Sequence, residues 1–273
     1  MAGKLYVMGT PIGNLGDFSP RAVSVLSECD FVAAEDTRVT VKLLNHFEIK
    51  KPLVSYYEHN KYDREDEILG KILGGETCVL VSDAGMPAIS DPGMELVKAC
   101  HLHGIPVESV PGPTAFATAL AISGMDNGRF TFEGFLSVNK KSRREHLDDI
   151  RLERRTMIFY EAPHKLSATL RDLYSTLGDR EIAIVREITK IHEEVIKTTL
   201  GQAVIDYPDN NLKGEIVLII AGAKEDKSEE VTLEGAVIMA QDFVSKGMSK
   251  NDAAKTVAKQ TGLKKGDIYK AIQ

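Results

Sequence analysis

Three loops rich in glycine and proline are the strongest candidates in this sequence for a ligand site. They read GTPIGNLGD at 9–17, SDAGMPAISDPG at 82–93 and VPGPTA at 110–115, and each follows a short apolar run. The long middle loop is costly to order unless it lines a binding crevice, and open α/β sheets bind ligands at the carboxyl ends of their strands. It contains Asp83 and Asp91 but no lysine or arginine, which suits a cationic or hydroxyl-bearing ligand better than a phosphate.

The first loop lacks the usual dinucleotide-binding pattern. Its glycines are spaced G-x-x-x-G-x-x-G, Pro11 removes a backbone donor, and the next helix is expected only at Pro20. Pyrophosphate binding requires a helix that opens within the glycine run. A dinucleotide-dependent oxidoreductase stays open as an alternative because Glu35 and Asp36 end the next apolar run, where such enzymes bind a ribose.

The first half of the chain shows the pattern of an α/β fold with a buried parallel sheet, in which short apolar runs alternate with helical segments. Ser19 and Pro20 are typical of a helix N-cap and first turn, and Gly104 is typical of a helix end. We expect strands over 4–8, 31–35, 53–56, 77–82 and 106–110, and helices from Ser19 and Pro20 and over 39–46, 62–73, 93–103 and 114–123. The three loops would then share one edge of the sheet.

The pattern changes after residue 123. Strands are expected over 129–133, 156–161, 181–186, 193–199 and 214–220, and some lie too close together for a helix between them, which predicts a mixed sheet. Residues 194–200 alternate as in an antiparallel strand with one wet face. Polar residues 223–230 indicate a linker, followed by helices over 232–246, 249–261 and 264–272 that are arranged like a helix-turn-helix.

Composition places the chain among ordinary globular proteins. It has 273 residues, 43% hydrophobic and 27% charged, and no apolar run reaches the ~18–20 residues of a membrane span. The amino terminus lacks the layout of a signal peptide, so we expect a cytoplasmic location. Cys29, Cys78 and Cys100 are widely spaced among apolar residues, which favours buried thiols over disulfides or a metal site.

Positive charge is concentrated in two segments. The whole chain carries −6, but residues 231–273 hold seven lysines against four acidic residues. A second cluster, between two expected elements, consists of Lys140, Lys141, Arg143 and Arg144 and is followed by Arg151, Arg154 and Arg155. Two basic clusters on an acidic chain favour phosphate contacts over a merely solvated surface.

A series of motifs, in a fixed order over about four-fifths of the chain, gives it a specific resemblance. They are LYVMGTPIGNLGD at 5–17, AAEDTR at 33–38, YEHN at 57–60, SDAGMPAISDPG at 82–93, VPGPTA at 110–115, FYEAPHKL at 159–166, REITKIHEE at 186–194 and KGEIVLIIAG at 213–222. With these motifs the chain resembles the tetrapyrrole methylase superfamily, the class III methyltransferases. Within it, the chain is similar to members that methylate the ribose 2′-hydroxyl of a decoding-centre cytidine in 16S ribosomal RNA (rRNA).

The resemblance implies an α/β protein with two α/β domains around a cleft, over 1–115 and 116–223, and a small basic helical domain over 231–273. It implies S-adenosyl-L-methionine as methyl donor, bound between the domains, and no metal is implied. The implied contacts are Gly9, Thr10, Pro11, Ser82, Asp83, Ala84, Gly85, Pro87, Ile89, Pro113, Thr114, Ala115, Phe159 and Tyr160.

Methyl transfer to a ribose hydroxyl requires an oxygen positioned ~3–3.5 Å from the methyl group and a group that receives its proton. The candidates at predicted strand ends are Glu35, Asp36, Arg38, Glu161, Arg186, Glu187 and Lys190. We favour Glu161 or Glu187 as proton acceptor and Lys190 or Arg186 as the partner of a phosphate or hydroxyl. A structural network of ion pairs among these residues is the alternative.

The resemblance also implies 16S rRNA or the small ribosomal subunit as a partner, and a homodimer. We assign RNA contacts to Lys140, Lys141, Arg143, Arg144, Lys264 and Lys265. The small, apolar residues of 114–125 fit a buried or interface helix. Two other functions stay open: methylation of a porphyrinoid carbon, which would not need the basic segments, and a non-catalytic RNA-binding factor in ribosome assembly, which would need no methyl donor.

Overall fold

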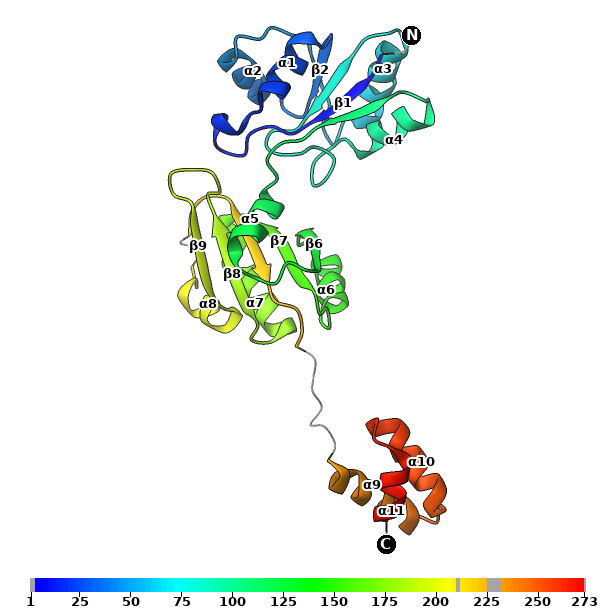
Figure 1. Cartoon of the computed structure of the whole chain (residues 1–273). Coiled ribbons are helices and arrows are strands. Elements are labelled where there is room, and N and C mark those ends of the chain that lie inside the picture. The colour runs from blue at the N-terminus through cyan, green and yellow to red at the C-terminus, as the bar shows by residue number, and fades with distance from the viewer. Residues whose placement is uncertain (1–2, 210–211, 225–231, 273) are drawn as a thin grey trace. The chain divides into compact units, whose positions relative to one another are not determined.

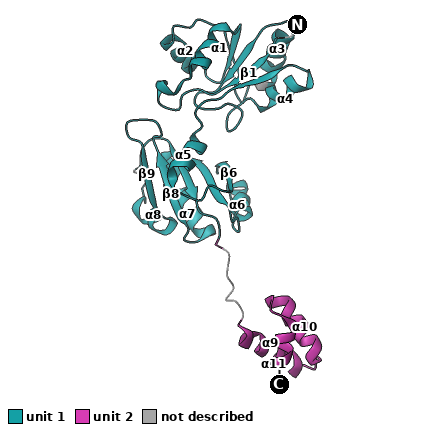
Figure 2. Cartoon of the chain, in the orientation of Figure 1, with its two compact units in different colours: residues 1–223 teal, residues 224–273 magenta. Residues whose placement is uncertain are grey.

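The computed structural model describes residues 3–209, 212–224 and 232–272. Two compact units make up the chain, Met1–Ala223 and Lys224–Gln273 (Figure 2). The first unit contains two five-stranded sheets, and the second is helical. Both α/β halves of the expected fold therefore lie within the first unit.

The first sheet is parallel throughout, as predicted, with strand order β3-β2-β4-β1-β5. Helices cover both of its faces, α3 and α4 on one and α1 and α2 on the other (Figure 1). Their buried side chains form one apolar cluster on each face of the sheet. The elements are β1 (Leu5–Met8), α1 (Pro20–Glu28), β2 (Phe31–Ala34), α2 (Thr37–His46), β3 (Leu53–Ser55), α3 (Lys61–Leu73), β4 (Cys78–Val81), α4 (Met94–Leu102) and β5 (Val107–Val110).

Local sequence signals set several boundaries in this half. The Ser19 hydroxyl accepts a hydrogen bond from the Ala22 N–H and Pro20 opens α1, as their residue types predict. The three cysteines are buried and free, as expected. Burial raises the pKa of the Cys29 and Cys100 thiols to about 11, so both are neutral packing residues.

The second sheet is mixed, as predicted, with strand order β6-β7-β10-β8-β9. Strands β6 and β7 are parallel, and the remaining neighbours are antiparallel. Helix α5 packs on one face and α6, α7 and α8 pack on the other. The last three helices were not predicted. The elements are α5 (Ala115–Ser123), β6 (Phe130–Phe135), α6 (Lys140–Asp149), β7 (Thr156–Glu161), α7 (Leu166–Leu177), β8 (Glu181–Arg186), β9 (Glu194–Thr199), α8 (Leu200–Asp206) and β10 (Ile216–Ile220).

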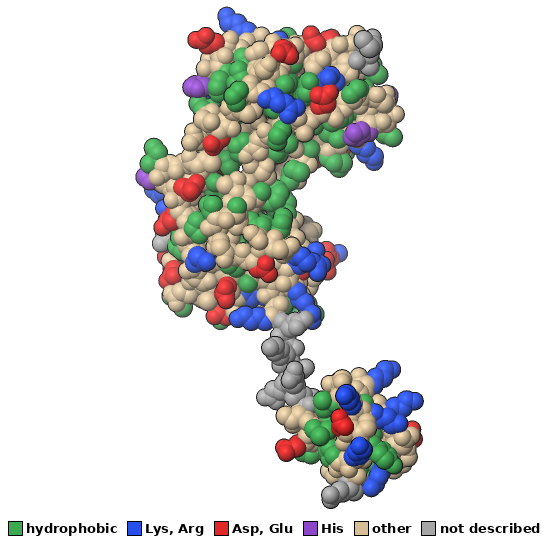
Figure 3. Space-filling model, viewed as in Figure 1, with side chains coloured by type: hydrophobic (Ala, Val, Ile, Leu, Met, Phe, Trp, Pro, Cys, Tyr) green, Lys and Arg blue, Asp and Glu red, His purple; other side chains and the backbone are tan. Residues whose placement is uncertain are grey.

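The second unit consists of α9 (Leu233–Ser245), α10 (Lys250–Thr261) and α11 (Lys265–Ala271) around a small core that includes Ala240, Ala254 and Ile268. Ser249 caps α10 through its hydroxyl, and Gly262 ends it in the left-handed conformation at φ 72°. All seven lysines of this unit that follow residue 231 are exposed, and Figure 3 shows several of them on one view. Most of the linker expected over 223–230 lies outside the described residues.

No helix in the described part of the chain combines the length and the apolar character that a membrane crossing needs.

Candidate functional site

The three glycine- and proline-rich loops meet at the carboxyl edge of the first sheet, as predicted. Thr10 and Gly85 exchange backbone hydrogen bonds of 2.9 and 3.1 Å, and the Thr10 hydroxyl donates to the Ser82 carbonyl at 3.2 Å. The backbones of Gly9 and Gly112 are in close contact: a Cβ added to Gly9 would lie only 2.7 Å from the Gly112 Cα. Only glycine permits this approach between two backbones.

A cleft of about 480 Å³ opens beside these loops, a volume within the ~300–1,000 Å³ typical of small-molecule sites. Both halves of the first unit contribute to its wall. The lining residues are Ile12, Glu35, Asp83, Ala84, Gly85, Met86, Ile89, Ser90, Asp91, Thr114, Ala115, Phe135, Tyr160, Glu161, Ala162, Pro163, Ile188, Glu215, Ile216 and Val217. Five of them are carboxylates, and this lining contains no lysine, arginine or histidine.

Strand pairing brings the second half to the cleft. Because β7 and β10 are antiparallel, the start of β10 lies beside the end of β7, with Ile216 opposite Glu161 and Val217 opposite Tyr160. The Tyr160 hydroxyl accepts a hydrogen bond of 3.2 Å from the Phe116 N–H. Ile12 of the first loop belongs to the apolar cluster on this face of the second sheet, so the two walls of the cleft are joined by packing.

The first half contributes three carboxylates to the cleft wall, those of Glu35, Asp83 and Asp91. The Asp83 N–H donates to Glu35 at 3.3 Å, and the Asp36 N–H donates to Asp83 at 3.1 Å. Burial is the main cause that raises the pKa of Glu35, Asp83 and Asp91 above their ordinary values. A bound cation would stabilise their ionised forms, so the wall is suited to a positively charged ligand.

Glu161 is one of two carboxylates, with Glu215, that the second half places in the cleft wall. Glu161 is only 5% exposed. One carboxylate oxygen accepts the Ala162 N–H at 2.7 Å, and the other accepts the Thr169 hydroxyl. Each oxygen has two lone pairs, so the group can accept a further hydrogen bond from a ligand.

The other candidates for proton transfer form ion pairs outside the cleft lining. Lys190 contacts Glu187 at 2.9 Å and the cleft residue Glu215 at 3.0 Å, and its hydrogen bond lowers the pKa of Glu187. Arg186 contacts Glu194 at 2.7 Å. Arg38 contacts Asp36 with its guanidinium and holds the pKa of that carboxyl at about 2. The alternative of an ion-pair network therefore describes five of the candidates, namely Asp36, Arg38, Arg186, Glu187 and Lys190.

Residues 4–204 match the model of the family described as Tetrapyrrole (Corrin/Porphyrin) Methylases. The chain belongs to this family. The resemblance inferred from the motifs is therefore confirmed.

Two curated relatives and one solved structure define this tetrapyrrole methylase further. "Ribosomal RNA small subunit methyltransferase I" of Synechocystis is 45% identical over 268 residues, 98% of this chain and 96% of the relative. The protein of the same name from Thermotoga maritima is 46% identical over 220 residues, which cover 99% of its length but 81% of this chain. Uroporphyrin-III C-methyltransferase of Thermus thermophilus, solved with S-adenosyl homocysteine, has the same fold, with TM-score 0.57 and 19% identity over 80% of this chain and 97% of that chain.

The cofactor contacts that the sequence implied divide into groups in this tetrapyrrole methylase. Those in the cleft wall are Asp83, Ala84, Gly85, Ile89, Thr114, Ala115 and Tyr160. Thr10, Pro11 and Ser82 line a smaller pocket of about 280 Å³, which shares Asp83 with the cleft. Gly9, Pro87 and Pro113 line neither. Phe159 is 1% exposed and packs in the apolar core, and it does not line the cleft.

Several cleft residues were missed by reasoning from the sequence. The main group is Glu215, Ile216 and Val217, which lie in a quoted motif but reach the cleft only through the β7–β10 pairing. The others are Ile12, Met86, Ser90, Phe135, Ala162, Pro163 and Ile188. The carboxyl end of β7 was a usable signal for Ala162 and Pro163, since ligand loops follow such ends. In the described part of the chain, no three His, Cys, Asp or Glu side chains are arranged to hold a metal ion.

The basic cluster at 140–144 lies on α6, which the sequence did not predict as a helix. Lys140, Lys141 and Arg144 are exposed, as an RNA-binding role requires. Arg143 is not available for RNA, because its side chain is 17% exposed and its guanidinium contacts Asp172 at 2.7 Å.

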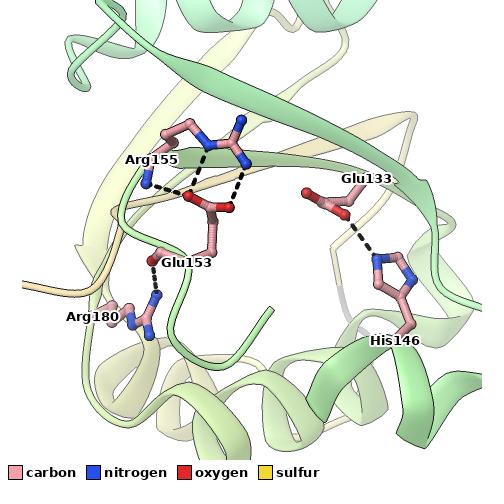
Figure 4. Close-up of polar contacts among 5 residues, drawn as sticks. All are labelled: Glu133, His146, Glu153, Arg155 and Arg180. Carbon is pink, nitrogen blue, oxygen red and sulfur yellow. Dashed lines mark hydrogen bonds and ion pairs between the residues drawn. The ribbon is translucent and has the colours of Figure 1, made fainter. Parts of the chain in front are cut away.

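Two sets of polar contacts, drawn in Figure 4, hold α6 against β6 and fix the segment before β7. His146 of α6 contacts Glu133 of β6 at 2.9 Å. Arg155 contacts Glu153 at 2.6 Å, and this hydrogen-bonded pairing lowers the pKa of Glu153 to about 2. Arg180 donates to the Glu153 carbonyl at 3.2 Å. Arg155, one of the basic residues noted in the sequence, is therefore paired with an acidic neighbour.

Proposed function

We propose that this protein transfers a methyl group from S-adenosyl-methionine to small-subunit rRNA, with the ribose 2′-hydroxyl of a decoding-centre cytidine as acceptor. The names of relatives 45–46% identical to the chain support the rRNA substrate. The choice of ribose and of cytidine rests on the resemblance of the motifs.

The observation that carries the proposal is the charge of the cleft. Its wall has five carboxylates and, within the lining, no cationic side chain. S-adenosyl-methionine bears a sulfonium and an ammonium group, and the solved relative that holds its demethylated product has the same fold. An acidic wall attracts the sulfonium more than the neutral thioether of the product, so it favours exchange of product for fresh methyl donor.

The bound cofactor supplies an electrophilic methyl group: the oxygen–methyl bond forms as the methyl–sulfur bond breaks, and sulfur keeps the electron pair. The chain must orient the hydroxyl and receive its proton. Glu161 suits this role because it lies in the cleft wall, is fixed by two donors and can accept a third. A weak base is sufficient, because the hydroxyl proton becomes strongly acidic as its oxygen gains the methyl group.

RNA would be held outside the cleft by the exposed cations. Lys140, Lys141 and Arg144 lie on α6 of the first unit, and Lys264 and Lys265 lie on the second unit. Because the match to the Thermotoga maritima relative leaves part of this chain without a counterpart, we assign the second unit an accessory role in RNA affinity. A homodimer in the cytoplasm is part of the same proposal.

The test combines cofactor binding with mapping of the methylated nucleotide. Calorimetry should show S-adenosyl-methionine binding that chelators leave unchanged. Small subunits from a strain that lacks the protein should then gain one ribose methylation when incubated with protein and cofactor. Cofactor binding without RNA methylation would favour the small-molecule methylase, and RNA binding without cofactor binding would favour the assembly factor.

A further inference from the structure

A chain of hydrogen bonds connects the basic helix α6 with the carboxylate in the cleft. The Arg143 Nη2 donates to the Thr169 hydroxyl oxygen at 2.9 Å, and the Thr169 hydroxyl donates to Glu161 Oε2. Arg143 Nε also donates to Asp172 at 2.7 Å, which fixes the plane of the guanidinium. The three residues come from α6, α7 and β7, and two packed helices therefore define where the Glu161 carboxylate lies.

The hydrogen bonds from Arg143 through Thr169 to Glu161 are buried and have a fixed direction. Thr169 is 1% exposed and Glu161 is 5% exposed, so water does not replace either partner freely. A hydroxyl has one proton, and because arginine can only donate, the Thr169 proton is directed to the carboxylate. The arrangement fixes one oxygen of the Glu161 carboxylate and orients its remaining lone pairs.

From these contacts we infer that Arg143 and Thr169 are positioning residues for the reaction, acting through Glu161. The inference rests on the proposed function, in which Glu161 accepts the proton of the ribose hydroxyl. It replaces the RNA contact that the sequence suggested for Arg143. Helix α6 then serves both RNA binding and catalysis. Its exposed face carries Lys140 and Arg144 for RNA, while Arg143 orients Glu161, the proton acceptor, through Thr169.

The first experiment measures methylation of small subunits by full-length variants as a function of pH. Thr169→Val removes the hydroxyl at nearly constant volume and should lower kcat by ~10–100-fold, less than the ~10²–10⁴-fold of complete general base catalysis because Glu161 itself is retained, with little change in KM for RNA. Because the carboxylate loses a hydrogen-bond donor in this variant, the acid limb of the kcat profile should move to higher pH. Thr169→Ser should restore most of the activity and the original limb.

Two other variants separate positioning from folding and from RNA binding. Ser175→Ala removes a hydroxyl from the same helix that donates only to the Asp172 carbonyl, and it should leave the profile unchanged. Arg144→Gln should raise KM for RNA without moving the acid limb. Arg143→Gln should behave like Thr169→Val. If Thr169→Val binds cofactor and melts like the parent but keeps its acid limb, the inference is wrong.

A measurement without substrate tests the hydrogen-bond chain independently of the proposed function. The carboxyl carbon signal of Glu161, assigned by its loss in Glu161→Gln, should shift in Thr169→Val relative to the parent, because one oxygen loses its hydrogen-bond donor. If that shift appears but no rRNA is methylated, the proposed function fails and the hydrogen-bond chain stands. If rRNA is methylated but neither the signal nor the acid limb moves, the hydrogen-bond chain has no role in positioning.

Discussion

The contact between Gly9 and Gly112 allows a direct test of how the loops build the cleft. In Gly9→Ala the new Cβ would lie 2.7 Å from the Gly112 Cα and 2.8 Å from the Met86 Sδ. Carbon atoms normally pack at ~3.5–4.0 Å, so the two loops must separate by roughly 1 Å. Gly9 is not among the glycines with positive φ, so the backbone conformation itself accepts alanine and the effect comes from the contact alone.

Crowding of this kind costs about 1–3 kcal/mol. A unit of this size loses roughly 2–4 °C in Tm per kcal/mol, so we expect the melting temperature to fall by about 2–12 °C. Displaced loops also widen the cleft, and affinity for S-adenosyl-methionine should fall at least about tenfold, the equivalent of ~1.4 kcal/mol.

Scanning calorimetry and cofactor titration measure both quantities, with Gly70→Ala as a matched control. Gly70 lies within α3 and a Cβ there meets no atom within 4 Å, so alanine should stabilise the helix by about 1 kcal/mol and leave cofactor affinity unchanged. If Gly9→Ala melts and binds like the parent protein, the close approach of the loops does not shape the site.

Three further outcomes are expected. Because the pKa values of Glu35, Asp83 and Asp91 are raised and a cation binds their ionised forms, affinity for S-adenosyl-methionine should fall as pH is lowered through them, which calorimetry at several pH values measures; a flat profile would contradict the acidic cleft. Alanine at Lys140, Lys141 and Arg144, or truncation after Ala223, should weaken RNA binding and flatten its salt dependence by roughly 0.7–0.9 per lost contact, with cofactor affinity unchanged; an unchanged salt slope would make these cations solvated surface. Light scattering at micromolar concentration should give the mass of a homodimer, and a monomeric mass would refute that prediction.

The local parts of the fold could be predicted because their causes are local. Ser19 and Pro20 mark the start of α1 by residue type alone, and the apolar runs of the first half are strands that helices cover on both faces. The position of the three loops also followed, since parallel strands end at one edge. In the second half, α6 was not predicted because its sequence is mostly charged and Leu147 is its one buried residue, so it shows no apolar periodicity.

The parts of the site that depend on contacts between distant segments could not be predicted. Glu215 reaches the cleft only because β10 pairs with β7, and strand order in a mixed sheet is not written in any single segment. Phe159, expected as a cofactor contact, packs in the core, because the motif gives residue types but not which residues turn inward. Arg143 belonged to a basic run whose other members are exposed, and only its partners on α7 distinguish it from them.

The distribution of charge explains why an RNA methyltransferase would need basic surfaces away from its cleft. Glu35, Asp83 and Asp91 suit a sulfonium and would repel the phosphates on either side of an acceptor ribose, whereas Glu215 is paired with Lys190. In the proposed function, the binding energy for RNA would then come from the exposed cations of α6 and of the second unit, while the ribose hydroxyl alone approaches the cofactor. Salt should therefore raise KM for RNA steeply, because exposed cations that bind phosphates release condensed counterions. Cofactor affinity should change little, because its charges lie against partly buried carboxylates, which salt screens much less.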